Sequence, residues 1–174
     1  PEHPMRPGQT EHANDRGSRV HDAAEAFVRG TGKLITELHH FGDHFEKLKA
    51  LFAQGQVELE GEWGMSSEWE ITSWRWAWLR LKLDSIVHDG PFQAIVIDYK
   101  TGKRFGNEVK HGEQINLYAL VAFLRYPELE EITAELWYLD TNELTSRTFT
   151  RRQALMFKKS FEARGHAITS CIEW

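Results

Sequence analysis

Residues 95–102 read IVIDYKTG, from Ile95 to Gly102. The three β-branched residues that open this stretch predict a strand buried on both faces. Side chains alternate between the faces of a strand, so Asp98 and Lys100 point the same way, about 7 Å apart along the chain. A buried acid and lysine at a strand end need a further partner, and a divalent metal is one such partner. A structural ion pair is the alternative.

A predicted hairpin brings a second carboxylate to this strand. Residues 88–93, HDGPFQ, form a turn between a strand ending near Val87 and the strand that begins near Ala94. With the turn centred near Gly90, Asp98 lies within a residue or two of Asp84 on the antiparallel neighbour. Two carboxylates this close repel each other, and a bound cation removes the repulsion.

The remaining periodicity predicts a layered domain. Apolar residues recur at helical spacing in four stretches, and residues of strand character fill five others. The predicted helices are 16–30 (capped by Ser18), 33–54, 108–126 and 151–165; the predicted strands are 57–63, 70–87, 94–100, 132–139 and 144–149. This order indicates an α/β or α+β fold with a central mixed sheet flanked by helices. We expect residues 1–16 to be a flexible N-terminal arm and 17–174 to be one domain.

Composition limits the classes of function. The 174 residues carry a net charge of −5, so phosphate groups have to be met by a local basic patch or by bound metal. One cysteine, Cys171, excludes an internal disulfide and a four-cysteine iron–sulfur cluster or zinc site. No apolar run is long enough to span a membrane, and no signal peptide is visible. We therefore expect an intracellular, cytoplasmic protein without membrane contact.

Aromatic and basic residues gather near the predicted hairpin, and each group has two interpretations. In the 70–87 strand, Trp74, Trp76 and Trp78 share the parity of Arg80 and Lys82. Such a stripe stacks on bases or, more commonly, packs under a helix. The loop 101–107, TGKRFGN, carries Lys103 and Arg104, which contact phosphates or are ordinary surface charge.

Four features of the sequence, in order, resemble a known family. They are Gly17-x-x-x-His21-x-x-x-Glu25 on the first helix, Asp84, the run Asp98-Tyr99-Lys100-Thr101-Gly102, and Gln114-x-x-x-Tyr118 on the following helix. Together they resemble the RecB-type exonuclease branch of the PD-(D/E)XK nuclease superfamily, which includes CRISPR-associated adaptation nucleases. The resemblance covers about residues 17–140 and lacks the cysteines of the iron–sulfur members. It implies a restriction-endonuclease-like core.

The resemblance implies a metal-dependent deoxyribonuclease that hydrolyses phosphodiester bonds, with the exonuclease activity of that branch. Asp84 and Asp98 would hold Mg²⁺ or Mn²⁺, with His21 and the backbone carbonyl of Tyr99 as further ligands. Lys100 would orient the attacking water. The other site residues implied are Gln114 and Tyr118 beside the catalytic group, and Glu25 more weakly. From their positions around the motif, we expect Lys82, Lys103 and Arg104 to contact DNA.

The expected partner is DNA, single-stranded or with duplex ends, and a recombination or replication protein is a candidate partner as well. The alternative function is a non-catalytic nucleic-acid-binding module on the same fold. Such a module would be expected to have lost Asp98 or Lys100, and this sequence keeps both.

Overall fold

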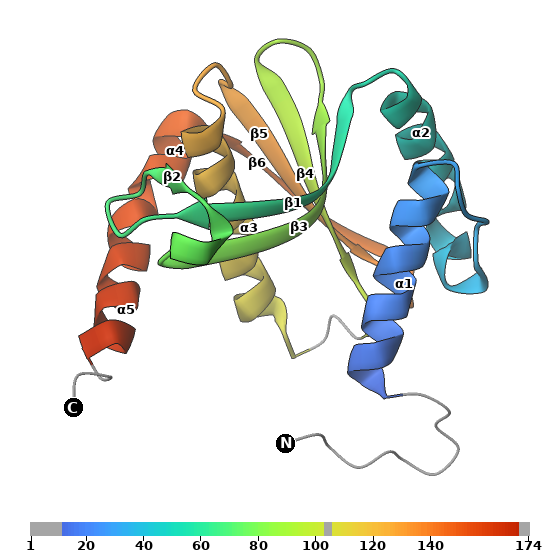
Figure 1. Cartoon of the computed structure of the whole chain (residues 1–174), viewed down its shortest axis with the longest axis horizontal. Helices are drawn as coiled ribbons and strands as arrows, with labels where there is room; N and C mark the ends of the chain where they lie inside the picture. The colour runs from blue at the N-terminus through green and yellow to red at the C-terminus, as the bar shows by residue number, and fades with distance from the viewer. Residues whose placement is uncertain (1–11, 103–105, 171–174) are drawn as a thin grey trace.

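A six-stranded mixed sheet forms the centre of the molecule (Figure 1). The computed structural model describes residues 12–102 and 106–170, with side chains as far as residue 165. The strands lie in the order β2-β1-β3-β4-β5-β6; β4 and β5 are parallel and the other neighbours are antiparallel. They are β1 (Val57–Met65), β2 (Ile71–Thr72), β3 (Leu79–His88), β4 (Gln93–Lys100), β5 (Glu131–Tyr138) and β6 (Glu143–Thr150). The predicted mixed sheet flanked by helices is confirmed.

Helices cover both faces of the sheet (Figure 1). The N-terminal group lies over one face and the later group over the other, and each group buries its own hydrophobic cluster. The first group is α1 (Ala13–Val28), the 3-10 helix η1 (Thr36–Phe41) and α2 (Gly42–Ala53); the second is α3 (Glu108–Arg125), α4 (Arg151–Met156) and α5 (Lys158–Ser170).

Strand β1 changes the face to which its apolar residues point. Val57 and Leu59 pack in the cluster under α1 and α2, whereas Trp63 and Met65 pack in the cluster under α3. In a regular strand, residues of one parity share one face. The change falls at Glu60, whose φ of 49° lies in the left-handed region that non-glycine residues rarely adopt.

Strand β3 makes the same change at the same level. Leu81 and Leu83 belong to the α3 cluster together with Ile86, while Val87 belongs to the α1 cluster. The parity therefore shifts between residues 83 and 86, next to Asp84. Extending the register of Leu59 with Ser85 and of Gly61 with Leu83 places Glu60 opposite Asp84. Both strands bend together at this point.

Strands β3 and β4 separate where this bend occurs. Their ladder runs from His88–Ala94 to Ser85–Ile97 and then ends, although β3 continues beside β1 and β4 continues beside β5. One further step in the register would pair Asp84 with Asp98. The predicted hairpin register is therefore confirmed, and both carboxylates lie at the fork between the two strands.

The N-terminal prediction needs one correction. Helix α1 begins at Ala13, and Ser18 lies inside it rather than at its cap; His12 occupies the cap position without a side-chain hydrogen bond. Residues 13–16, expected in the flexible arm, belong to this helix. The rest of the expected arm, residues 1–11, lies outside the described residues.

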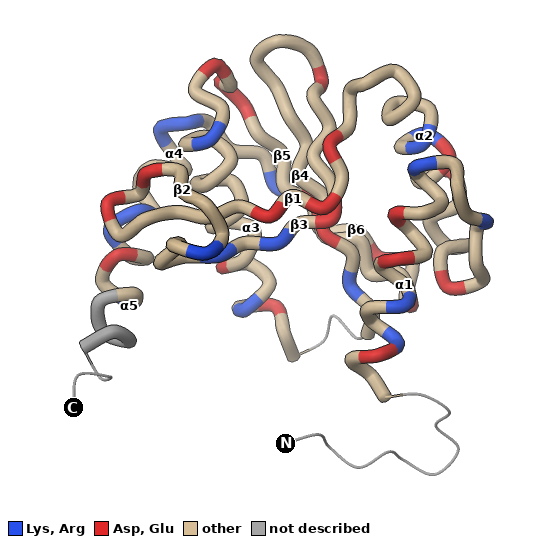
Figure 2. Tube along the Cα trace, in the orientation of Figure 1, with Lys and Arg blue, Asp and Glu red and all other residues tan. Residues whose placement is uncertain are grey.

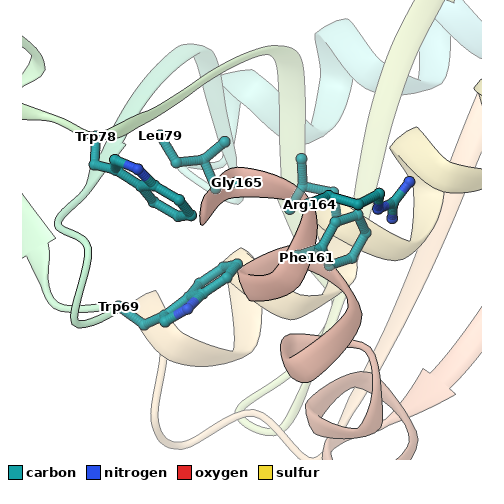
Figure 3. A pocket seen from close by; sticks show the side chains of 7 residues that line it. Trp69, Trp78, Leu79, Phe161, Arg164 and Gly165 are labelled. Carbon is teal, nitrogen blue, oxygen red and sulfur yellow. The ribbon is translucent and has the colours of Figure 1, made fainter. Parts of the chain in front are cut away.

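The predicted continuous strand over 70–87 is wrong. Only Ile71 and Thr72 form β2, and a short 3-10 turn, η2 (Trp74–Trp76), precedes β3. Trp78 donates its backbone N–H to Met65, and its indole packs against α5 (Figure 3). The expected tryptophan stripe is thereby divided: Trp78 packs under a helix, and Trp74 and Trp76 lie on the turn.

Two predicted helices are each divided in the structure. The pattern over 33–54 folds as the 3-10 turn η1 followed by α2, and the pattern over 151–165 folds as α4 and α5, separated at Phe157. Periodicity places the apolar residues correctly in both cases but does not show where the helical hydrogen bonds are interrupted. Among the described residues, no helix is long and apolar enough to cross a membrane.

Candidate active site

Asp84 occupies the fork from the β3 side and is held at both carboxylate oxygens. Its Oδ1 lies 2.6 Å from Nδ1 of His21 on α1, and its Oδ2 accepts the backbone N–H of Tyr99 at 2.6 Å. The Tyr99 N–H no longer has a ladder partner on β3, because the two strands have separated. The Asp84 side chain takes the place of that partner and joins α1, β3 and β4 at one point.

Asp98 and Lys100 form a nearly buried ion pair on β4. Asp98 is 5% exposed, and the Lys100 ammonium lies 2.6 Å from its Oδ2. They are two positions apart on the strand, so alternation places both on the face toward α3. The prediction that the two side chains lie side by side is confirmed.

Tyr118 and Gln114 hold Asp98 from α3. The Tyr118 hydroxyl lies 2.8 Å from Asp98 Oδ1 and 2.9 Å from the Lys82 carbonyl oxygen, and it accepts a hydrogen bond from Gln114 Nε2 at 2.6 Å. Residues four apart share one helix face, which is why both reach the fork. The hydroxyl thus binds a carbonyl of β3 and a carboxylate of β4 across the gap.

The electrostatics of the fork disfavour two bare carboxylates. Burial raises the pKa of Asp98; the charge of Lys100 opposes this shift and the charge of Asp84 adds to it. Burial lowers the pKa of His21, but the hydrogen bond and charge of Asp84 outweigh it, so that the pKa is raised overall. Burial beside Asp98 raises the pKa of Tyr118, which keeps its hydroxyl neutral as a donor.

A pocket of about 320 Å³ opens beside the fork. Its lining combines acidic side chains with groups from the start of α1: Gly17, Ser18, His21, Asp22, Glu60, Lys82, Asp84 and Asp98. Carboxylate oxygens are the ligands that Mg²⁺ and Mn²⁺ prefer, so the donor set fits a hard divalent cation. Within the described residues, no three His, Cys, Asp or Glu side chains form a ready ligand group. Mg²⁺ commonly binds through one or two carboxylates and keeps several waters, which suits this site.

The other predicted site residues have varied surroundings in the structure. Glu25 pairs with Arg29 and not with Lys100. Lys82 is exposed, and its ammonium lies 3.8 Å from Glu60. Lys103 and Arg104 lie outside the described residues. The carbonyl of Tyr99 remains a predicted ligand, while its side chain is buried on the α1 face.

Glu60 lines the pocket, and the sequence analysis did not single it out. Burial and the charge of nearby Glu25 raise its pKa, with Lys82 opposing. The alternation of residues 57–63 places Glu60 on an exposed face with Glu58 and Glu62, and so hides it among surface charge. The register that places Glu60 opposite Asp84 depends on a strand pairing that the sequence does not show.

Arg16 and Asp140 form a second group that the sequence did not predict, at the end of the run Asp98–Gly102. Arg16 donates to both Asp140 oxygens at 2.9 and 2.7 Å, and Asp140 Oδ2 also accepts the Gly102 N–H at 2.9 Å. These bonds tie α1 to the residues that follow Lys100. Arg16 and Asp140 are 124 positions apart in the sequence, so no local pattern reveals their pairing.

Asp140→Asn should make stability less dependent on pH. The Arg16 hydrogen bonds hold the pKa of Asp140 below its usual value. The carboxylate therefore stabilises the fold above its unfolded pKa of about 3.9, and this contribution is lost as the pH falls through the lower folded pKa. We expect a loss of about 0.5–1 kcal/mol at pH 7 that shrinks in acid, measured by urea unfolding across pH. Glu162→Gln, which removes a 3.8 Å surface pair with Lys158, is the control; an equal profile for both variants would contradict the expectation.

Tyr118→Phe should destabilise the fork. The change removes the donor to Asp98 and to the Lys82 carbonyl, and it leaves the Gln114 amide without its acceptor. We expect the free energy of unfolding to fall by about 1–3 kcal/mol in urea titrations with EDTA present. Tyr126→Phe is the matched control, because that hydroxyl donates to the exposed Glu58, away from the fork. Equal losses in the two variants would count against a bracing role for Tyr118.

Comparison with known proteins identifies the class. The sequence model of the PD-(D/E)XK nuclease superfamily matches residues 2–170, so the chain belongs to that superfamily. No curated protein matches. Among solved structures that match is one titled "Crystal structure of SSO0001", at 15% identity and a TM-score of 0.36, covering 83% of this chain and 68% of that one. Nucleases of this superfamily generally use divalent metals such as Mg²⁺.

Proposed function

We propose that this protein is a divalent-metal-dependent DNA nuclease of the RecB-type branch that degrades DNA from ends. The observation that carries the proposal is the buried Asp98 carboxylate with the Lys100 ammonium 2.6 Å away, at a strand fork that also holds Asp84. A purely structural fork has no need of a buried acid beside a second acid, because apolar residues would fill it at lower cost. The order of His21, Asp84, Asp98, Lys100 and Tyr118 along the chain supports the RecB-type assignment.

In the proposed site, Asp84 and Asp98 would hold Mg²⁺ or Mn²⁺, with His21 and the Tyr99 carbonyl as further ligands. When bound, the metal polarises the phosphate and acidifies a water molecule. The single cysteine leaves no set of ligands for an iron–sulfur cluster, so we propose that none is used.

The protein groups then have separate roles. Lys100, which lies beside Asp98, would orient the attacking water and offset negative charge on the phosphate. Tyr118 and Gln114 keep Asp98 in place through the bonds described above. His21 keeps Asp84 in place through its Nδ1 contact and is available to a cation through its other ring nitrogen. We assign Glu25 no direct role beyond its charge near Glu60.

The proposal predicts a preference for DNA ends. In Mn²⁺ or Mg²⁺, linear end-labelled DNA should be shortened to small products, while covalently closed circular DNA of the same sequence should stay intact. Gel analysis of both substrates measures this, with Asp98→Asn as the inactive control. Equal cleavage of the circle would reassign the protein as an endonuclease. Binding of both DNAs without cleavage by the unaltered protein would favour the non-catalytic module.

A further inference from the structure

The turn η2 carries two indoles that lie outside both hydrophobic clusters, the exposed Trp76 and the half-buried Trp74. Trp76 is 72% exposed, and neither Trp74 nor Trp76 belongs to a hydrophobic cluster of the protein. An exposed tryptophan on a short turn is unusual in a domain that has enough apolar residues for its core. Its neighbours Trp69 and Trp78 are packed against α5 instead, around a pocket of about 350 Å³ (Figure 3).

Packing at Trp78 fixes the turn in place. Gly165 of α5 lies against the indole of Trp78 so closely that a Cβ at this position would overlap the ring. Trp78 also donates its backbone N–H to Met65 of β1 at 2.9 Å. The turn between β2 and β3 is therefore fixed by packing at Trp78, and the exposed Trp76 lies on a fixed base beside the half-buried Trp74.

Each of the two indoles has a guanidinium over one face. The Arg75 guanidinium carbon lies 5.2 Å from the centroid of Trp76, and that of Arg80 lies 5.5 Å from the centroid of Trp74. Arg80 also donates to the Arg75 carbonyl at 3.3 Å, which ties the two pairs together. Neither arginine forms an ion pair with a described carboxylate, so their charge is available to an anion.

Strand β3 connects this turn to the fork. Leu81 and Leu83 face α3, so alternation puts Arg80 and Lys82 on the other face, together with Asp84. From Arg80 to Asp84 the strand spans about 14 Å, the length of about four stacked nucleotides at 3.4 Å each. Figure 2 shows the basic positions of β3 beside acidic positions of β1, and Lys82 is partly neutralised by Glu60. The unopposed charge is therefore concentrated at the turn.

We propose that Trp74, Arg75, Trp76 and Arg80 form a stacking site for unpaired bases of single-stranded DNA, which then follows β3 to the fork. The inference deepens the proposed nuclease function and rests on it for the choice of DNA. An indole stacks on any base, and a guanidinium beside it contacts the neighbouring phosphate. This combination explains how a protein of net charge −5 holds a polyanion: through a local aromatic and basic site rather than through bulk charge.

Binding of a fluorescein-labelled oligothymidylate in EDTA, where no cleavage occurs, tests the site. Trp76→Ala should weaken binding about tenfold, because base stacking on an aromatic side chain is worth about that much. Arg80→Gln should lower the slope of log affinity against log salt by about 0.7. Ile71→Ala, which removes another exposed apolar side chain from the same segment, should change neither quantity.

Three outcomes would overturn the proposal. The first is undetectable binding of oligothymidylate by the unaltered protein, and the second is a Trp76→Ala variant that binds oligothymidylate as tightly as the unaltered protein. The third is a Trp76→Ala variant that keeps DNA binding but loses self-association in gel filtration, which would make the turn an interface between copies of the chain. Cleavage is measured separately on linear DNA. Cleavage without a Trp76 effect refutes the stacking site alone, whereas a Trp76 effect without cleavage refutes the nuclease function and leaves the binding site standing.

Discussion

Asp98→Asn is expected to reduce DNA cleavage by at least about 10³-fold while the apo protein stays as stable as the unaltered one or becomes more stable. The carboxylate is 5% exposed, and burial raises its pKa, so the fold holds the charged form at a cost. The amide keeps an acceptor for Tyr118 and removes the repulsion from Asp84. Lys100, whose side chain is 22% exposed, can turn toward solvent.

Lys100→Met gives the opposite result for stability. Cleavage should fall by about 10²–10³-fold, because the group that offsets charge on the phosphate is lost. The buried Asp98 carboxylate then has no cation beside it, so the free energy of unfolding should drop by about 1–3 kcal/mol. Cleavage rates on linear DNA and urea unfolding in EDTA give both quantities. If Asp98→Asn instead unfolds the protein, the ion pair between Asp98 and Lys100 serves the fold rather than catalysis.

Metal should restore both activity and stability to a stripped sample. EDTA is expected to abolish cleavage and Mn²⁺ or Mg²⁺ to restore it. A cation that binds the folded state alone stabilises by about 2.7 kcal/mol at 100 times its Kd, which raises Tm by about 5–10 °C for a chain of this size. Thermal melts with and without Mn²⁺ measure the shift.

The control for the metal prediction is Asp98→Asn, which should lose the Mn²⁺-dependent shift while keeping its melting point in EDTA. Glu162→Gln, on α5 and away from the fork, should keep the full shift. Undiminished cleavage in a metal-stripped sample would refute the two-carboxylate mechanism.

Local patterns predicted the part of the site that depends on near neighbours. The turn at Gly90 fixes the β3–β4 register, and this alone brings Asp84 to Asp98; four-residue spacing brings Gln114 to Tyr118. Contacts between residues that lie far apart in the sequence could not be predicted from local patterns. Arg16 contacts Asp140 only because α1 lies beside the end of β5. Glu60 reaches the pocket only because the side chains of β1 change faces at this residue.

The predicted strand with a tryptophan stripe over residues 70–87 was wrong for a different reason. Alternation alone made Trp74, Trp76 and Trp78 equivalent, whereas the 3-10 turn takes the first two out of the sheet and leaves Trp78 against Gly165 of α5. A short interruption in the backbone leaves no mark on the hydrophobic pattern, because tryptophan suits a strand and a packed turn equally well.

The exchange of faces by β1 and β3 bears on how the molecule loses its structure. Val57 and Leu59 anchor β1 in one hydrophobic layer, and Trp63 and Met65 anchor the same strand in the other. Neither layer can melt without withdrawing residues from its neighbour, so the two should act as one cooperative unit. Denaturation curves recorded by circular dichroism and by tryptophan fluorescence are then expected to coincide. The fork lies where β1 and β3 pass from one hydrophobic layer to the other, so local opening there requires most of the free energy of global unfolding.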